Sequence, residues 1–249
     1  MNLKINKWWF YRDLSFLWNT RSNCAYIKKL RTLGIQIGTG CVFRDPRKTR
    51  IDVSRSALVS IGNNVDINSN FQILTHDWAS YVFLQKYHDL INSSGHVTIG
   101  SNIYIGTNVT VLKGVTIGDN SIVAAGSIVT KDIPANSVAA GIPCRVVCSL
   151  EEYYKKRKQV GLSEAVEFVR AIRKRLLRNP YPREMREEFI YFVNSDNVQK
   201  YESEGVPVKG QLGNAYDEWI MNHKSRFRDF DEFLSYVDLL DSKKTNEGV

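Results

Sequence analysis

Aliphatic side chains recur at every sixth residue through the middle of this chain. The longest unbroken run consists of Ile99, Ile105, Val111, Ile117, Val123 and Val129. A shorter run, Ile61, Ile67 and Ile73, has the same spacing, and Ile37 lies in phase with it. Amphipathic helices repeat near every 3.6 residues and half-buried strands every 2, so neither produces this pattern. A period of six predicts a solenoid with three short strands in each coil of about eighteen residues, and one aliphatic side chain pointing inward from each face.

The six-residue phase is interrupted between Ile73 and Ile99, which are two residues out of step. We interpret residues 77–96 as a loop that leaves the coil and returns to it, and such excursions from regular scaffolds often carry function. Glycine follows the repeated aliphatic residue at positions 100, 106 and 118. We expect these small residues to allow the tight corners that a three-sided coil needs.

Composition separates a strand-rich body from a helical tail. No glutamate precedes Glu151, whereas glutamate is frequent after it. Because glutamate favours helices and disfavours strands, the sequence predicts three parts. These are a helical N-terminal segment (residues 1–34), a β-solenoid (35–148) and a helical C-terminal extension (149–249).

Helix boundary signals refine this division. A first helix is expected over about Ser22–Leu33, and Ser149 with Glu152 forms a capping box that opens the tail. We expect Gly161 to end that tail helix, and Ser163 to begin another that stops before Pro180. A further helix is expected to begin at Pro182, and a last helix is expected over Asp231–Leu240.

The positive charge is concentrated at the N-terminus. Of the net +8, residues 1–34 carry +6, from seven basic residues and one acidic residue. The solenoid therefore offers no basic groove for nucleic acid, and we expect no nucleic-acid partner. Aromatic and basic residues alternate over residues 1–20, which fits either contact with an anionic membrane or packing against the protein. No run of eighteen apolar residues occurs, so we expect a cytoplasmic protein, at the inner face of the membrane if this segment binds lipid.

The four cysteines do not have the spacing of a metal site. Cys24, Cys41, Cys144 and Cys148 form no CxxC pair and no Cys/His ligand pattern. We expect reduced, buried thiols and no metal ion.

Two segments of the body carry a family resemblance. The stretch VTIGSNIYIGTNVTVLKGVTIGDNSIVAAGSIVTKDIPANSVAAGIPCRVV (residues 97–147) and the upstream SIGNNVDINSNFQILTHD (60–77) resemble the hexapeptide-repeat acyltransferases. They are most similar to the galactoside and maltose O-acetyltransferase branch, and LGIQIG (33–38) with EEYYKKRKQ is similar to relatives that acetylate surface polysaccharides. The resemblance implies a mainly β fold, a left-handed parallel β-helix, assembled as a homotrimer that transfers acetyl from acetyl-CoA to a carbohydrate acceptor.

The resemblance also implies roles for individual residues. His76, in the ILTHD coil, matches the catalytic histidine, and imidazole is suited to take a hydroxyl proton near neutral pH. The backbone amide of Thr107 matches the donor to the tetrahedral oxyanion. The positions that match contacts to acetyl-CoA are Tyr104 (where the branch usually has tryptophan), Thr107, Ala125, Thr130, Lys131 and Arg145. Lys131 and Arg145 are also suitable partners for phosphate groups by charge alone.

The excursion supplies candidate contacts to the acceptor. Asp77 and Trp78 follow the histidine directly, and His88 and His96 lie on or beside the loop. Asp77 is also a candidate to orient His76, although an exposed loop carboxylate explains it equally well. A related fold serves zinc-dependent carbonic anhydrases, but the spacing of His76, His88 and His96 does not match their three ligands.

These observations predict an acetyl-CoA-dependent O-acetyltransferase that modifies a sugar hydroxyl in a surface polysaccharide or its precursor. Three alternatives stay open at this point. They are an N-acetyltransferase of an amino sugar nucleotide, an acetyltransferase that inactivates an antibiotic, and a β-helix module without catalytic activity.

Overall fold

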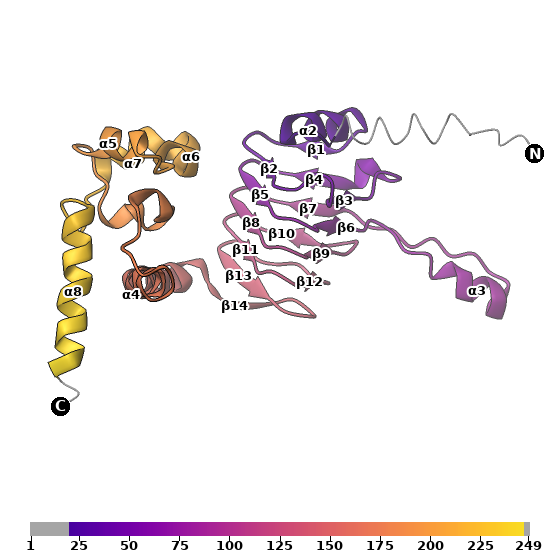
Figure 1. The fold of residues 1–249 in the computed structure, drawn as a ribbon. Helices are drawn as coiled ribbons and strands as arrows, with labels where there is room; N and C mark the ends of the chain where they lie inside the picture. Colours follow the sequence, from indigo (N-terminus) through magenta and orange to yellow (C-terminus); the bar gives the residue numbers. More distant parts are fainter. Residues whose placement is uncertain (1–19, 247–249) are drawn as a thin grey trace, which may run out of the picture. The chain divides into compact units, whose positions relative to one another are not determined.

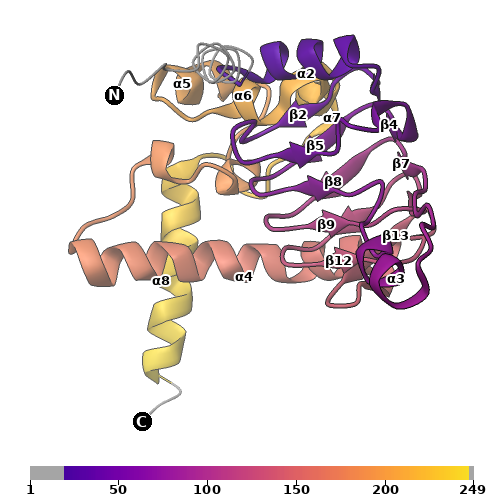
Figure 2. The ribbon, with the colours of Figure 1, turned by 90° about the vertical axis from the view of Figure 1, so that its right-hand side faces the viewer.

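A computed structural model describes residues 20–246 of the chain (Figures 1 and 2). The chain divides into two compact units between Tyr154 and Lys155. The predicted membrane-binding or packing segment, residues 1–20, lies outside the described residues except for its last position.

The first unit is a stack of coils built from three sheets (Figure 1). Sheet A contains β1 (Gln36–Ile37), β4 (Val59–Ile61), β7 (Val97–Ile99) and β10 (Thr116–Ile117). Sheet B contains β2 (Val42–Phe43), β5 (Val65–Ile67), β8 (Ile103–Ile105), β11 (Ile122–Val123), β13 (Ser137–Ala140) and the antiparallel β14 (Arg145–Ser149). Sheet C contains β3 (Arg50–Ile51), β6 (Gln72–Ile73), β9 (Thr110–Val111) and β12 (Ile128–Val129). Apart from β14, all neighbours pair in parallel, and three such sheets are typical of a left-handed β-helix.

The strand register confirms the six-residue period. Ile61, Ile99 and Ile117 stack on one another in sheet A, and each is almost completely buried. The first coil departs from the regular length, because Ile37 pairs with Ile61, 24 residues later, rather than 18. Its additional residues lie at the corners before β3 and before β4. Ile37 therefore keeps its phase because the insertions together equal one repeat.

Asparagine makes the left-handed turns at the corner between sheets A and B. Asn64, Asn102, Asn120 and Asn136 all have positive φ, between 54° and 58°. The side-chain amides of the first three each donate to the next Asn oxygen along the stack, at 3.1 to 3.3 Å. The repeat glycines act differently from our expectation, since a Cβ at Gly106 would lie 2.5 Å from the Ala125 nitrogen. Those glycines permit the close approach of successive coils rather than the turn itself.

A helix closes the N-terminal end of the coil stack. Helix α2 (Asn23–Thr32) confirms the helix expected over about Ser22–Leu33. The Ser22 hydroxyl caps it, and its Tyr26 and Leu30 pack into the core of the solenoid. The expectation of buried thiols is confirmed for Cys41 and Cys144. It is wrong for Cys24, which lies on the solvent side of α2.

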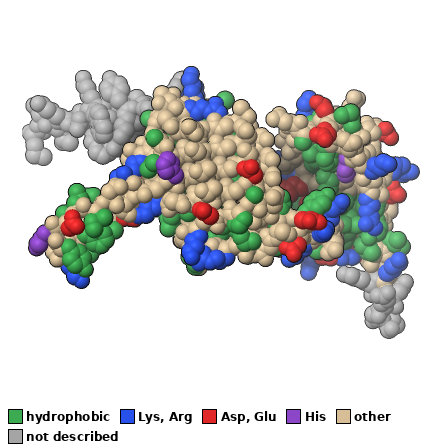
Figure 3. Space-filling model, turned by 180° about the vertical axis from the view of Figure 1, so that it is seen from behind, with side chains coloured by type: hydrophobic (Ala, Val, Ile, Leu, Met, Phe, Trp, Pro, Cys, Tyr) green, Lys and Arg blue, Asp and Glu red, His purple; other side chains and the backbone are tan. Residues whose placement is uncertain are grey.

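The predicted excursion forms an arm that projects from the stack and contains a helix, α3 (Ser80–Tyr87) (Figures 1 and 3). Its two chain segments pair at the base, where Gly95 N–H donates to Thr75 O and His76 bridges to Ser94. Apolar side chains gather on its surface (Figure 3). The exposed ones are Trp78, Tyr81, Val82, Tyr87, Leu90 and Ile91.

The second unit begins inside one long helix, α4 (Leu150–Leu176). The Ser149–Glu152 capping box that opens it is confirmed. The expected end at Gly161 and new start at Ser163 are wrong, because the helix continues through both. A Cβ at Gly161 would lie 2.5 Å from the Tyr191 hydroxyl, so the glycine makes room for a neighbouring side chain. The buried stripe of Ala165, Val166, Val169 and Ile172 sustains the helix beyond it.

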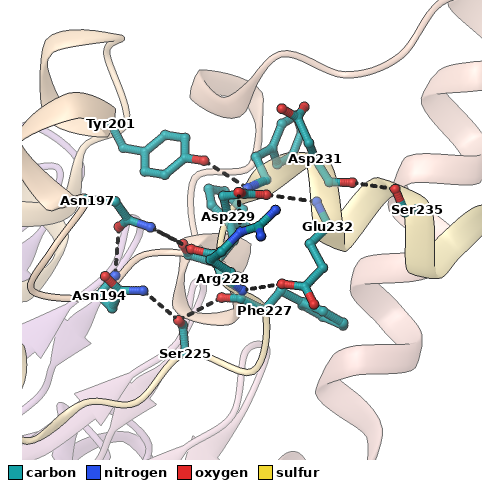
Figure 4. A network of polar contacts seen from close by, with 12 residues as sticks. Asn194, Asn197, Tyr201, Ser225, Phe227, Arg228, Asp229, Asp231, Glu232 and Ser235 are labelled. Atoms are coloured by element: carbon teal, nitrogen blue, oxygen red, sulfur yellow. Dashed lines mark hydrogen bonds and ion pairs between the residues drawn. The ribbon is translucent and has the colours of Figure 1, made fainter.

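The remaining elements pack around a second hydrophobic core. They are the 3₁₀ turns η2 (Pro182–Glu184), η3 (Glu188–Tyr191) and η4 (Gly213–Ala215), and helices α5 (Val198–Ser203), α6 (Val208–Leu212), α7 (Tyr216–Asn222) and α8 (Phe230–Asn246). Asp229 caps α8 by accepting the Glu232 N–H at 2.9 Å, and Glu232 accepts the Arg228 N–H at 2.6 Å (Figure 4). Helix α8 contains the predicted last helix and is longer. Over residues 20–246, no helix combines the length and apolar character needed to cross a bilayer.

Candidate active site

The solenoid has two edges at which candidate residues collect. The C–A edge is the corner where the chain passes from sheet C to sheet A, and it includes residues 74–76, 112–114 and 130–132 in successive coils. The B–C edge is the corner between sheets B and C, and it includes residues 44–49, 68–70, 106–108 and 124–126. The two edges bound opposite ends of the strands of sheet C.

His76 lies on the C–A edge, where the arm leaves the second coil. Its Nδ1 contacts Asp52 Oδ2 at 2.5 Å, and Asp52 follows β3 one coil earlier. The imidazole is 37% exposed, and the carboxylate is only 10% exposed. Within the described residues, Nε2 of His76 has no hydrogen-bond partner. Asp52 thus holds one ring nitrogen and leaves the other available for a further hydrogen bond.

Four donors hold Asp52 in its charged form. The hydroxyl and backbone N–H of Ser54 donate to Oδ1 at 2.6 and 3.0 Å, and the Thr75 hydroxyl donates to Oδ2 beside His76. Burial alone would raise the pKa of Asp52, but the hydrogen bonds from Ser54, Thr75 and His76 outweigh it and hold the pKa well below the ordinary value. An ionised Asp52 can accept only, so in the neutral imidazole Nδ1 of His76 carries the proton and Nε2 carries the lone pair.

Asp77 does not orient His76. Its carboxylate pairs with the Lys113 ammonium, accepts the Ser93 hydroxyl at 2.9 Å and accepts the Ala79 N–H at 3.0 Å. The Lys113 hydrogen bond, followed by those of Ala79 and Ser93, lowers the pKa of Asp77 to about 2. Asp77 therefore ties the base of the arm to the next coil of the solenoid.

The other residues expected from the sequence to contact the acceptor substrate are spread along the arm. The Trp78 side chain is 65% exposed, and His88 lies at the C-terminal end of α3 with φ of 53°. His96 is exposed at the return of the arm, and its carbonyl accepts the Gly114 N–H. Of these three, Trp78 and His96 belong to the base of the arm, whereas His88 belongs to its helix.

Thr107 and Ala125 stack on the B–C edge, on the third and fourth coils. The Thr107 carbonyl accepts the Gly126 N–H at 2.8 Å, while within residues 20–246 no acceptor is found for the Thr107 N–H. The Ala125 N–H has no acceptor among these residues either, so unpaired backbone amides recur on this edge. An amide of this kind can donate to a negatively charged oxygen.

The candidate phosphate contacts lie at the last coil, on both edges. Thr130 and Lys131 follow β12 on the C–A edge, and both are exposed. Arg145 pairs with Ala140 at the start of β14, which brings it to the B–C edge beyond Ala125. Tyr104 is on the outer face of sheet B, where its hydroxyl accepts from the Asn68 amide at 3.0 Å.

The described residues include an imidazole nitrogen and backbone amides without partners, together with exposed cations. Groups of these kinds are able to accept a proton, to donate to a negatively charged oxygen and to bind phosphate, and the chain divides them between two edges. Sequence reasoning missed Asp52, which stands 24 residues before His76. Its signal was the IDVS segment, in which an acidic residue follows a buried isoleucine directly. Ile51 pairs with Ile73, 22 residues later, because this coil contains insertions, and His76 lies further along the same edge, so counting in steps of eighteen could not find the contact.

Comparison with known proteins identifies relatives of the solenoid. Residues 96–131 match the family model described as bacterial transferase hexapeptide (six repeats). The chain is 45% identical to the galactoside O-acetyltransferase of Escherichia coli over 109 residues, which are 42% of this chain and 53% of that protein. The chain thus spans about half the length of that relative. It is 41% identical to Protein CapG of Staphylococcus aureus over 128 residues, which are 51% of this chain and 73% of that protein.

Two solved structures of acetyltransferases are also similar to this chain. A galactoside acetyltransferase in complex with coenzyme A is 28% identical, with a TM-score of 0.39, and the match covers 58% of this chain and 80% of that one. A maltose O-acetyltransferase from Clostridium difficile is 31% identical, with a TM-score of 0.38, over 56% of this chain and 84% of that one.

Proposed function

Since this chain belongs to the bacterial hexapeptide-repeat transferases, we propose that it transfers acetyl from acetyl-CoA to a hydroxyl of a sugar, with His76 as the general base. The contact between His76 and the buried, ionised Asp52 carries this proposal, because it leaves Nε2 as a free acceptor at the base of the arm. The printed name of the galactoside O-acetyltransferase supports a sugar hydroxyl as the acceptor. We also propose the left-handed coil and the three-part division at residues 34 and 148.

The proposed reaction follows from these groups. His76 Nε2 takes the proton of the acceptor hydroxyl as its oxygen attacks the thioester carbonyl carbon. The Thr107 N–H donates to the oxygen that becomes negative in the tetrahedral intermediate. Cleavage of the carbon–sulfur bond then releases the thiolate of coenzyme A, which the protonated His76 neutralises. Asp52 stabilises the imidazolium while it exists and keeps the ring in one tautomer.

We expect His76→Ala to lower turnover by roughly two to four orders of magnitude, the usual contribution of a general base. Release of coenzyme A, followed with a thiol reagent, measures turnover. Affinity for acetyl-CoA, from calorimetry, should stay close to that of the wild type, because the imidazole is proposed to act on the acceptor. If the variant kept more than half of the wild-type turnover, His76 would have no place in the mechanism.

We propose that the active enzyme is a homotrimer with the site shared between neighbouring chains. In one chain, Thr107 and His76 belong to opposite edges of sheet C. Six residues connect these edges within a coil, from Thr107 to Lys113, or roughly 15–20 Å of nearly extended chain. The base and the oxyanion donor must both lie within a few ångströms of one carbonyl group. A three-fold axis would bring the C–A edge of one chain beside the B–C edge of the next and so complete the site.

A mixing experiment tests the shared site. One variant carries His76→Ala on the C–A edge, and the other carries Ala125→Trp, which fills the B–C edge. In trimers reassembled from an equal mixture, about one site in four would combine the two intact edges. We expect close to a quarter of wild-type turnover from the mixture and almost none from either variant alone. An inactive mixture, with mixed trimers verified by mass spectrometry, would mean that one chain holds the whole site.

The remaining parts of the site have proposed roles toward the two substrates. Ala125, Thr130, Lys131 and Arg145 would hold coenzyme A, with the two cations on its phosphates. Tyr104, on the face of sheet B, is also proposed as a contact to coenzyme A. Trp78, His88 and His96 would contact the acceptor from the arm, together with Asp77 at its base. The LGIQIG and EEYYKKRKQ segments support an acceptor in a surface polysaccharide or its precursor.

A further inference from the structure

A second group of cations lies at the N-terminal end of the B–C edge. They surround a cavity of about 280 Å³ at the corner between β2 and β3. The residues that line it are Arg47, Lys48, Arg50, Asn70, Phe71 and Gln72. Apart from the buried Phe71, every one of these side chains can donate hydrogen bonds into the cavity.

Two of the three cations have no counter-ion. Across the described residues, the side chains of Arg47 and Arg50 form no ion pair or hydrogen bond, and both are exposed. Lys48 pairs with Asp45 at 3.6 Å, and Asp45 also accepts the Ser69 hydroxyl at 3.0 Å. Asp45 is the one acidic side chain found at this corner, so the cavity keeps a charge of +2.

The position of the cavity relative to Thr107 separates it from the coenzyme A contacts. Arg50, Gln72 and Thr110 occupy successive strands of sheet C, so the cavity between the first two lies one to two coils, or about 5–10 Å, before the proposed oxyanion donor. Ala125 and Arg145 lie beyond Thr107 in the opposite direction along the same edge. The proposed thioester site therefore has Arg47 and Arg50 on one side and Arg145, a proposed contact to the phosphates of coenzyme A, on the other.

We propose that the acceptor is an anionic saccharide, and that Arg47 and Arg50 bind its carboxylate or phosphate group. This inference rests on the proposed acetyl transfer. His76 is on the second coil and the cavity is between the first and second, so an acceptor whose hydroxyl reaches His76 of a neighbouring chain extends toward the cavity. Guanidinium groups bind carboxylate and phosphate through paired, charge-assisted hydrogen bonds, which fits either source of the charge.

Three matched acceptors test the proposal. Galactose is neutral, galacturonate carries a carboxylate, and galactose 6-phosphate carries a phosphate, while the ring hydroxyls at the other positions are the same. We expect kcat/KM for at least one anionic acceptor to exceed that for galactose by roughly tenfold or more. A preference for galacturonate would identify the bound group as a carboxylate, and a preference for galactose 6-phosphate would identify it as a phosphate. Equal kcat/KM for the neutral and both anionic sugars would overturn the proposal.

A double variant, Arg47→Gln with Arg50→Gln, locates the effect. It should raise KM for the anionic acceptor by roughly tenfold to a hundredfold, while turnover of galactose and KM for acetyl-CoA stay unchanged. Arg44→Gln is the control for loss of a guanidinium group from the same coil, because Arg44 pairs with Asp66 on sheet B and does not line the cavity. An equal loss for neutral and anionic acceptors, or an equal loss in the control, would contradict a role for this cavity.

A direct measurement of anion binding distinguishes failure of the anion site from failure of the proposed acetyl transfer. Calorimetry with galacturonate and galactose 6-phosphate uses full-length protein saturated with coenzyme A, so that Lys131 and Arg145 are already occupied. Binding that the double variant loses and Arg44→Gln keeps would support the anion site even if no sugar were acetylated. Absence of binding to the wild type would overturn the anion site, whereas acetylation of galactose with loss of turnover in His76→Ala would still support the enzyme.

Discussion

Replacing Asp52 by asparagine changes the protons around His76 while nearly preserving the shape of the side chain. Oδ1 of Asp52 accepts the backbone N–H of Ser54, which can only donate. The amide oxygen of the new asparagine must therefore take the Oδ1 position, and its NH₂ group takes the Oδ2 position beside His76. The NH₂ group then donates to Nδ1, which moves the imidazole proton to Nε2. The variant loses its base although every heavy atom remains in place.

The size of the effect follows from this tautomer change. A ring protonated on Nε2 cannot accept the hydroxyl proton, so we expect kcat to fall by roughly two to four orders of magnitude. At 1.36 kcal/mol for each factor of ten, this is about 3–5 kcal/mol of transition-state stabilisation. Catalysis by the oxyanion donor and by substrate positioning remains and sets the lower limit of activity.

Steady-state release of coenzyme A measures kcat and KM for both substrates. We expect KM for acetyl-CoA to change less than threefold, since Asp52 is remote from the proposed coenzyme A contacts. Asp66→Asn is the matched control, because Asp66 pairs with Arg44 on the outer face of sheet B and should leave kcat unchanged. Circular dichroism checks that both variants fold.

Two results would refute the reasoning. A kcat for Asp52→Asn within threefold of the wild type would mean that the tautomer of His76 does not matter. Equal losses in Asp52→Asn and Asp66→Asn would indicate a general effect of charge rather than an effect on His76.

Two further predictions concern stability. The pKa of Asp77 is lowered from 3.8 to about 2, so its ion pair with Lys113 should stabilise the fold above pH 3.8 and lose this effect as the pH falls toward 2. The difference in melting temperature between the wild type and Asp77→Asn should therefore disappear over that range, and a constant difference would contradict the pairing. Gly161→Ala should destabilise the second unit, because its Cβ would lie too close to the Tyr191 hydroxyl. Adding Tyr191→Phe should remove this clash and recover the helix propensity of alanine, about 1 kcal/mol. Denaturant unfolding measures both stabilities, and a single variant as stable as the double would refute the prediction.

The repeat pattern was predictable because each inward position of a coil has one neighbour above and one below. That environment selects aliphatic residues at a fixed interval, and the interval alone predicts three strands per coil. The corners were less predictable. Asn64 and its equivalents at 102, 120 and 136 repeat with the coils, but the amide ladder that selects asparagine exists only when the coils are stacked.

Helix boundaries show the limit of local signals. Gly161 followed by Ser163 has the appearance of one helix ending and another beginning. The deciding contact is with Tyr191, 30 residues later, which needs the space that a side chain would fill. Tertiary packing thus overrides a propensity of only about 1 kcal/mol.

The coil period, the place of the arm, the helical tail and the position of His76 were predictable from the chain alone, because each depends on neighbouring residues or on a regular interval. The carboxylate that holds His76 is evident only in the folded protein. The fold pairs the adjacent Asp77 with Lys113 and brings Asp52 from the preceding coil to His76. It also separates the candidate residues onto two edges of the solenoid. Insertions at the corners of the first coil lengthen the chain but do not change the rise between coils, so Asp52 and His76 meet at a separation that the regular eighteen-residue coil does not give.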